Sequence, residues 1–194
     1  MIKLGITGYI GSGKTSVTNI IKKNTKIPTF CADDAVNVIY KKDIKIKKKL
    51  FKIEPSLKNK KFLKKKVINL IYKNKKFLNK LEKIIHPLVR KRMNKFIKKN
   101  KNKKTILLDI PLLIENKLYK KLDKIILIQC KRELRIKRFL KTGRDINLFK
   151  LLEKKQLSFV YKKKFADYII KNNKNLKNLK KNVVYLIKNI EKNA

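Results

Sequence analysis

The sequence is poor in the residues that build disulfide frameworks and metal sites. It has only 2 cysteines and 1 histidine among 194 residues, and it has no tryptophan. Cys31 and Cys130 are too few for a disulfide framework and lack the spacing of zinc ligands. No apolar run approaches the roughly 20 residues of a transmembrane helix, and Met1 is followed by no apolar signal segment. We therefore expect a cytoplasmic protein with reduced cysteines and no membrane partner.

Acidic residues are also scarce, because 13 of them face 56 lysines and arginines, which gives a formal net charge of +43. Such a charge is typical of nucleic-acid or membrane surfaces. The lysines are spread along the whole chain, however, which favours a bias toward AT-rich codons as their origin. We expect weak binding to polyanions but no specific nucleic-acid partner. Only six of the basic residues are arginines, so an arginine can mark a site that needs a planar, bidentate group.

The apolar pattern predicts an α/β fold. Short apolar runs, rich in β-branched residues, predict five strands, at 2–7, 27–32, 104–111, 123–130 and 166–172. Helical patterns separate these strands, which is typical of a parallel sheet covered on both faces. Residues 35–103 show only helical spacing, with a break expected at Pro87. Residues 132–164 are also expected to be helical, with an interruption near Thr142–Asp145.

Four of the five glycines lie between Gly5 and Gly13, directly after the first predicted strand. Gly8 and Gly13, followed by Lys14 and Thr15, match the pattern G-x-x-x-x-G-K-[ST] of a phosphate-binding loop. In such a loop the main-chain N–H groups surround a polyphosphate, the lysine reaches the β- and γ-phosphates, and the hydroxyl binds Mg²⁺. The pattern predicts nucleoside triphosphate binding, and the guanine-reading sequence N-K-x-D of GTPases is not found.

Three aspartates lie at the ends of predicted strands, at the edge where ligands bind in parallel sheets. Asp33 and Asp34 end the second strand, and Asp109 ends the third. Asp34 is expected to act on an attacking hydroxyl, and Asp33 to cap the following helix or assist. Asp109 is expected to bind Mg²⁺, directly or through water.

Arginines and the single histidine supply further candidates. Arg138 and Arg144 are expected to stabilise the transferred phosphoryl group from a helical lid, whereas Arg132 and Arg135 fit a solvated helical face. His86 alone favours a structural role.

In this order, the motifs resemble those of the dephospho-coenzyme A kinase family, from Met1 to beyond Asn172. The motifs are GITGYIGSGKTSV, CADDAVNVIY, LEKIIHPLVR, LLDIPLLIEN, KRELRIKRFLKTGRD and LLEKKQLSFVYKKKFADYIIKNN. The resemblance implies that ATP, with Mg²⁺, phosphorylates the ribose 3′-hydroxyl of dephospho-coenzyme A. It also implies a three-layer P-loop fold with a helical acceptor-binding domain (35–103), a lid (132–164), and a core formed by 1–34, 104–131 and 165–194.

The resemblance assigns roles to residues of this sequence. Catalysis is assigned to Asp34, Lys14, Arg138 and Arg144. ATP binding is assigned to Gly8, Gly11, Ser12, Gly13, Lys14, Thr15, Ser16 and Asn172. Acceptor binding, which gives His86 a functional role, is assigned to Asp34, His86, Arg90, Pro111, Leu112 and Glu115. Magnesium binding is assigned to Thr15 and Asp109.

The sequence departs from the family pattern at a few positions. Tyr9 stands where a second glycine is usual, and Lys60 and Lys174 replace an expected arginine and glycine. The Ala32-Asp33-Asp34 order leaves open which aspartate is the base. Another P-loop kinase acting on a nucleotide or small alcohol stays an alternative, and a basic nucleic-acid-binding ATPase is a more distant one. We expect a monomer.

Overall fold

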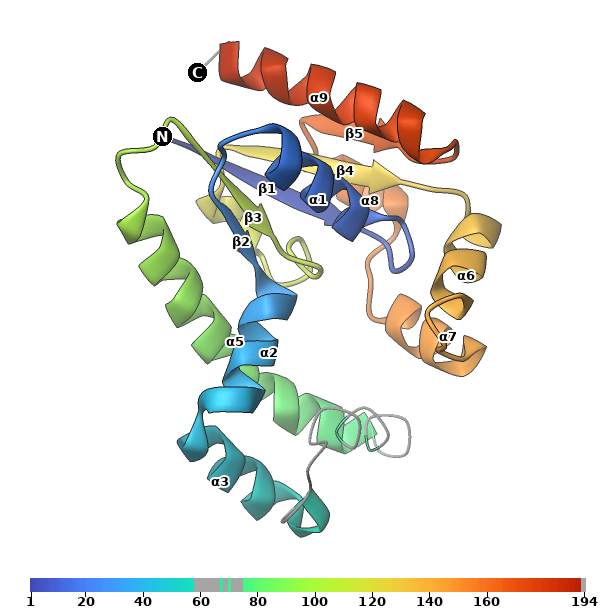
Figure 1. The fold of residues 1–194 in the computed structure, drawn as a ribbon. Helices are drawn as coiled ribbons and strands as arrows, with labels where there is room; N and C mark the ends of the chain where they lie inside the picture. The colour runs from blue at the N-terminus through green and yellow to red at the C-terminus, as the bar shows by residue number, and fades with distance from the viewer. Residues whose placement is uncertain (58–66, 68–69, 71–74, 193–194) are drawn as a thin grey trace. The chain divides into compact units, whose positions relative to one another are not determined.

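The computed structural model describes residues 1–57, 67, 70 and 75–192. The chain divides into two compact units, Met1–Phe30 with Asn100–Ala194, and Cys31–Lys99. The first unit contains the sheet and the second is helical (Figure 1). Lys60 lies outside the described residues. The functional division into core, acceptor-binding domain and lid stays a prediction.

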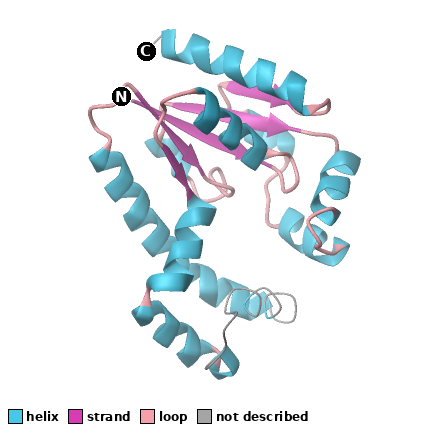
Figure 2. Ribbon diagram, viewed as in Figure 1, coloured by secondary structure: helices cyan, strands magenta, loops and turns pink. Residues whose placement is uncertain are grey.

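The five predicted strands form one parallel sheet, and the expected fold class is confirmed (Figure 2). The spatial order is β2-β3-β1-β4-β5. The strands are β1 (Ile2–Gly8), β2 (Thr29–Cys31), β3 (Thr105–Asp109), β4 (Lys124–Gln129) and β5 (Tyr168–Lys171). Every residue of β3 is buried, as expected for a parallel strand covered on both faces. In the register of the sheet, Ile6 of β1 lies opposite Asp109 of β3.

Two helices pack together on one face of the sheet, α1 (Lys14–Asn24) and α9 (Leu176–Lys192) (Figure 1). Helix α9 buries residues at steps of three and four, namely Leu179, Val183, Ile187 and Ile190. That spacing places them on one side of a helix. They share a core with Leu4, Ile6, Val17 and Ile126. This core holds the start of α1, and with it the loop after β1, against the sheet.

Residues 132–164, here called the lid segment, form three short helices: α6 (Arg132–Leu140), α7 (Ile146–Lys154) and α8 (Phe159–Lys163). The turn between α6 and α7 coincides with the interruption expected near Thr142–Asp145. Asp145 caps α7 by accepting hydrogen bonds from the main-chain N–H groups of Asn147 and Leu148. A short 3-10 helix, η2 (Leu118–Lys121), was not expected from the sequence.

The second unit contains α2 (Ala32–Lys42), α3 (Ile44–Ile53), η1 (Pro55–Leu57) and α5 (Lys75–Lys99). The expected helix break at Pro87 is wrong, because α5 continues through it. Proline removes one helical hydrogen bond. Ile85 and Leu88, on either side of it, pack into the same core as Ile39 and Leu50. The packing of both halves of α5 outweighs the lost bond.

Candidate active site

The loop of residues 8–15, here called the phosphate loop, joins β1 to α1. Gly11 and Gly13 have φ angles of +73° and +89°, a region that favours glycine. Both also lie in close contact with other segments. A Cβ atom on Gly11 would overlap the main-chain carbonyl of Arg135, and one on Gly13 would overlap the side-chain amide of Asn172. Glycine is therefore required here by close packing as well as by backbone geometry.

Lys14, in the phosphate loop, pairs with Asp109 at the end of β3. The Lys14 ammonium forms an ion pair with Oδ1 of Asp109. Thr18 Oγ1 donates a hydrogen bond of 2.8 Å to Oδ2 of the same carboxylate, which is 2 % exposed. The structure thus brings together two residues that the sequence singled out, and it adds Thr18, one turn beyond Lys14 on α1.

Asn172 and Arg138 lie beside the second half of the loop. Asn172 is buried, and its Nδ2 donates a 2.8 Å hydrogen bond to the carbonyl of Ser12. Arg138 Nη1 donates to the carbonyl of Asn172, at 3.1 Å, and to Sγ of Cys130, at 3.2 Å. Burial raises the pKa of the Cys130 thiol, although Arg138 opposes the shift. The predicted lid arginine Arg138 and the predicted ATP residue Asn172 therefore contact one another next to the phosphate loop.

Arg135 is not on a solvated face, and that expectation is wrong. It is 6 % exposed, because its guanidinium lies 4.5 Å from the ring centroid of Tyr9 and its Nη2 is 2.8 Å from Oε1 of Glu153. Burial acts to raise the pKa of Glu153, but hydrogen bonds from Arg132 and Arg135 lower it below its usual value. Arg132 is half exposed and pairs with the same carboxylate at 2.9 Å.

Glu115, expected on the acceptor side, belongs to a buried ion pair. Its Oε1 lies 2.7 Å from Nζ of Lys162, which is fully buried. The same oxygen accepts a 3.1 Å hydrogen bond from the N–H of Leu157. The Tyr9 ring centroid is 4.9 Å from the Lys162 ammonium. Burial lowers the pKa of Lys162 below its usual value, although Glu115 opposes the shift.

The other predicted site residues of the first unit lie on helix α1, in the loop after β3 and in the lid segment. Thr15 and Ser16 are in the first turn of α1. The carbonyl of Pro111 accepts a 3.2 Å hydrogen bond from Thr7 Oγ1, and Leu112 follows it directly. Arg144 is exposed, with its guanidinium 5.4 Å from the Phe139 ring centroid.

Asp34, His86 and Arg90 belong to the second unit. Asp33 and Asp34 lie in the first turn of α2, where carboxylates favour a helix N-terminus. Cys31 occupies the N-cap position. The expectation that Asp33 caps this helix is therefore wrong, because β2 ends one residue earlier than the apolar run. His86 and Arg90 lie one turn apart on α5 and share a side of it.

Gln156 was given no role by sequence reasoning, yet it binds the phosphate loop at two points. Its Oε1 accepts a 2.9 Å hydrogen bond from the N–H of Ile10, and its Nε2 donates to the carbonyl of Gly8 at 3.3 Å. The only signal in the sequence is its place in the closing motif LLEKKQLSF, which does not indicate a partner 146 residues away.

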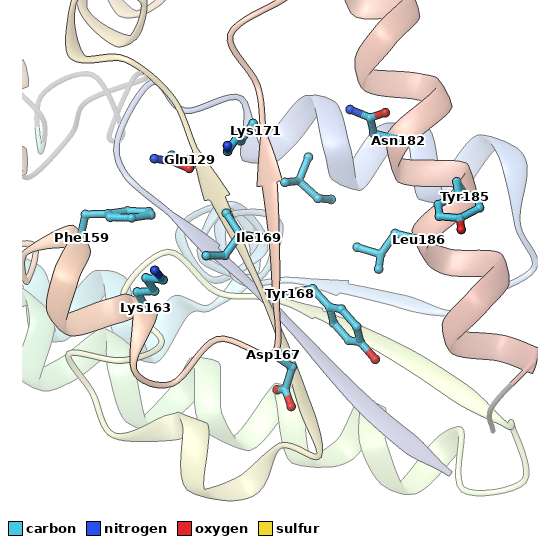
Figure 3. Close-up of a pocket in the computed structure, with 11 residues that line it drawn as sticks. Gln129, Phe159, Lys163, Asp167, Tyr168, Ile169, Lys171, Asn182, Tyr185 and Leu186 are labelled. Atoms are coloured by element: carbon cyan, nitrogen blue, oxygen red, sulfur yellow. The ribbon is translucent and has the colours of Figure 1, made fainter.

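A cavity of about 710 Å³ lies elsewhere in the first unit (Figure 3). It is lined by Tyr168, Ile169 and Lys171 of β5, with Tyr185 and Leu186 of α9. Among the described residues that line it, none belongs to the predicted site. The cavity therefore does not support the predicted site, which rests on the residues of the phosphate loop and their contacts.

Two further findings concern the described part of the chain. No group of three or more histidine, cysteine, aspartate or glutamate side chains there is arranged to hold a metal ion. No described helix combines the length and the apolar character needed to cross a membrane.

Comparison with known proteins gives a consistent result. The family model for dephospho-CoA kinase matches residues 2–178. The chain is 35% identical over 192 residues to a dephospho-CoA kinase of Rickettsia typhi, with 98% of each chain covered. It is 31% identical over 193 residues to that of Bartonella henselae, again with 98% of each covered. The solved structure of dephospho-CoA kinase from Campylobacter jejuni aligns with a TM-score of 0.70, at 26% identity and with 98% of each chain covered.

Proposed function

The chain belongs to the dephospho-CoA kinase family, whose activity is the final step of coenzyme A biosynthesis, and we propose how its residues perform the phosphoryl transfer. The family expected from the sequence motifs is thereby confirmed. In the reaction, the ribose 3′-hydroxyl oxygen of dephospho-coenzyme A forms a bond to the γ-phosphorus of ATP. The bond from that phosphorus to the β,γ-bridging oxygen breaks, and ADP leaves.

The phosphate loop is the ATP end of the site. The observation that supports this role best is that Lys14 and the buried Ser12 hydroxyl converge here. The Ser12 oxygen is buried and has no hydrogen-bond partner within the described residues, so it can bond to a phosphate oxygen. Lys14 is held at the loop by Asp109 and can turn its ammonium to the β- and γ-phosphates. Arg138 and the exposed Arg144 supply positive charge as the phosphoryl group separates.

The donors present fit a magnesium ion. Thr15 is exposed in the first turn of α1, and Asp109 is a carboxylate fixed by Lys14 and Thr18. Mg²⁺ commonly takes one or two protein oxygens, and phosphates and water complete its shell. Thr15 would hold it directly, and Asp109 directly or through water. When bound, Mg²⁺ neutralises charge on the phosphate oxygens.

Asp34 is the proposed general base. Its carboxylate takes the proton of the ribose 3′-hydroxyl as that oxygen attacks, a role that contributes about 10² to 10⁴-fold in rate. His86 and Arg90 would bind the acceptor from α5, with Pro111, Leu112 and Glu115 from the loop after β3. Glu115 has one oxygen committed to Lys162, and its buried Oε2 has no hydrogen-bond partner among the described residues.

The test is to incubate the purified protein with Mg²⁺-ATP and dephospho-coenzyme A and to detect coenzyme A by mass. Asp34→Asn should lose at least about 10²-fold in kcat while its ATP affinity is retained, because only the proton acceptor is removed. Asp33→Asn, one residue away in the same helical turn, is the matched control and should stay near the parent rate. Normal turnover by Asp34→Asn would reject Asp34 as the base, and loss in Asp33→Asn alone would transfer the role to Asp33.

A further inference from the structure

Three side chains from separate segments donate hydrogen bonds to alternate carbonyls of the phosphate loop. The bonds are Gln156 Nε2 to Gly8 at 3.3 Å, Arg135 Nη1 to Ile10 at 3.4 Å, and Asn172 Nδ2 to Ser12 at 2.8 Å. The donors come from the segment between α7 and α8, from α6, and from the end of β5. From Gly8 to Ser12, every second carbonyl of the loop is therefore bound by a side chain from outside the loop.

This arrangement determines where the intervening N–H groups point. No peptide bond in the described residues is cis, and in a trans peptide the C=O and N–H directions are opposed. A carbonyl bound by an outer side chain therefore turns the N–H of the next residue to the other face of the loop. The three N–H groups turned in this way are those of Tyr9, Gly11 and Gly13. They form one set of donors of the kind that surrounds a phosphate.

We propose that Gln156 is a positioning residue for ATP, which orients the first half of the phosphate loop through its side-chain amide. Gln156 is suited to this because one planar group satisfies both Gly8 C=O and Ile10 N–H. Without it, the Gly8–Tyr9 peptide can rotate and present its carbonyl, which repels phosphate. The inference rests on the proposed role of the loop in ATP binding.

Neighbouring contacts hold Gln156 in place. The hydroxyl of Tyr9 donates a 2.9 Å hydrogen bond to the carbonyl of Leu157. The main-chain N–H of Leu157 donates a 3.1 Å hydrogen bond to Oε1 of Glu115. The residue after Gln156 is thus bound on both sides of its backbone, once to the phosphate loop and once to the loop after β3. These contacts of Leu157 limit how far the backbone next to Gln156 can move.

The experiment measures ADP binding by calorimetry and the KM of both substrates in Gln156→Met and Gln156→Glu. Gln156→Met keeps the side-chain length but removes both hydrogen bonds, and Gln156→Glu keeps only the acceptor for Ile10. Two ordinary hydrogen bonds correspond to about tenfold. We expect the ADP Kd and the ATP KM to rise about tenfold in Gln156→Met and at least several-fold in Gln156→Glu. The KM for dephospho-coenzyme A should change less than about twofold.

Gln129→Met and Gln129→Glu are the matched controls. Gln129 and Gln156 both line a second pocket, of about 440 Å³. We expect the two Gln129 variants to bind ADP with the affinity of the parent. An unchanged ADP Kd in both Gln156 variants, or an equal rise of both KM values, overturns the inference. Lys14→Met separates this result from failure of the proposed function. If Lys14→Met turns over normally, the loop itself is misassigned; if only the Gln156 variants behave as the parent, the positioning role alone is wrong.

Discussion

Two buried lysine–carboxylate pairs in the first unit have the same chemistry but different surroundings. Lys14 and Asp109 have side chains that are 11% and 2% exposed, and Lys162 and Glu115 have side chains that are 0% and 11% exposed. In both pairs the carboxylate has a second donor, which is the Thr18 hydroxyl for Asp109 and the Leu157 N–H for Glu115. In the second pair the ring of Tyr9 lies against the lysine.

We call the Lys14–Asp109 pair exchangeable, because its lysine can bind a ligand instead, and the Lys162–Glu115 pair permanent. We predict that Lys14 leaves Asp109 for a phosphate when ATP binds, because a new anion then replaces the old one. Among the described residues, Glu115 is the carboxylate that pairs with Lys162. Parting the two would leave an uncompensated buried charge, which costs several kcal/mol. We therefore predict different roles for the two pairs, one in ligand binding and one in anchoring the lid segment to the loop after β3.

The largest effect should come from the exchangeable pair. Lys14→Met removes the ammonium that is proposed to bind the β- and γ-phosphates. We expect kcat/KM to fall by about 10³-fold or more, which is equivalent to about 4 kcal/mol of transition-state stabilisation. The loss should be seen with every acceptor tested, because it concerns ATP. The effect on stability should be much smaller than the effect on the rate. We expect the midpoint of urea unfolding to stay close to that of the parent, since Thr18 still binds Asp109. Parent-like turnover would end the distinction between the two pairs.

The permanent pair should affect stability instead. Lys162→Met removes the counter-charge of Glu115 and leaves it only the N–H of Leu157 as a donor. We expect this to lower the free energy of unfolding by about 3 kcal/mol. The double variant Lys162→Met/Glu115→Leu removes both charges and should recover most of that loss. Urea unfolding of the parent, both single variants and the double variant gives the coupling energy. Additive losses would show that the two side chains do not act as a pair.

The smallest effect is a pH dependence. Burial lowers the pKa of Lys162 in the folded protein below its usual 10.5. Between the folded pKa and 10.5 the unfolded chain binds more protons than the folded one, so the free energy of unfolding rises with pH there, by at most about 1.4 kcal/mol per pH unit. Below the folded pKa, the burial penalty is fully present. The titration is isolated by measuring the free energy of unfolding of the parent and of Lys162→Met at increasing pH up to 10.5, and taking the difference at each pH. A flat difference would contradict it.

Features set by local patterns could be predicted from the sequence. The phosphate loop, the five strands and the helices of the lid segment each depend on the spacing of neighbouring residues. Asp109 could be placed at the same edge of the sheet as the phosphate loop, because it ends one strand of a parallel sheet and the loop follows another. Its ion pair with Lys14 was not predicted. The roles assigned to the predicted site residues, including Asp34, Lys14 and Arg138, all stay predictions.

Contacts between distant segments could not be predicted in this way. Nothing near Gln156 indicates that its amide binds Gly8 and Ile10, and nothing near Arg135 indicates that it is buried. The expectation of a solvated face for Arg135 came from its three-residue spacing with Arg132. That spacing describes the helix and does not show what packs against it. Tertiary packing also overrode local propensity at Pro87, where helix α5 continues.

The contact of Gly11 with the backbone of α6 has a consequence for protein engineering. Any side chain at this position collides with a carbonyl of another helix, so a library that randomises the loop will lose folded members before ATP affinity is tested. A phosphate loop transplanted from another kinase would meet the same obstacle unless α6 came with it. The loop and that helix should therefore be exchanged together, as one cassette.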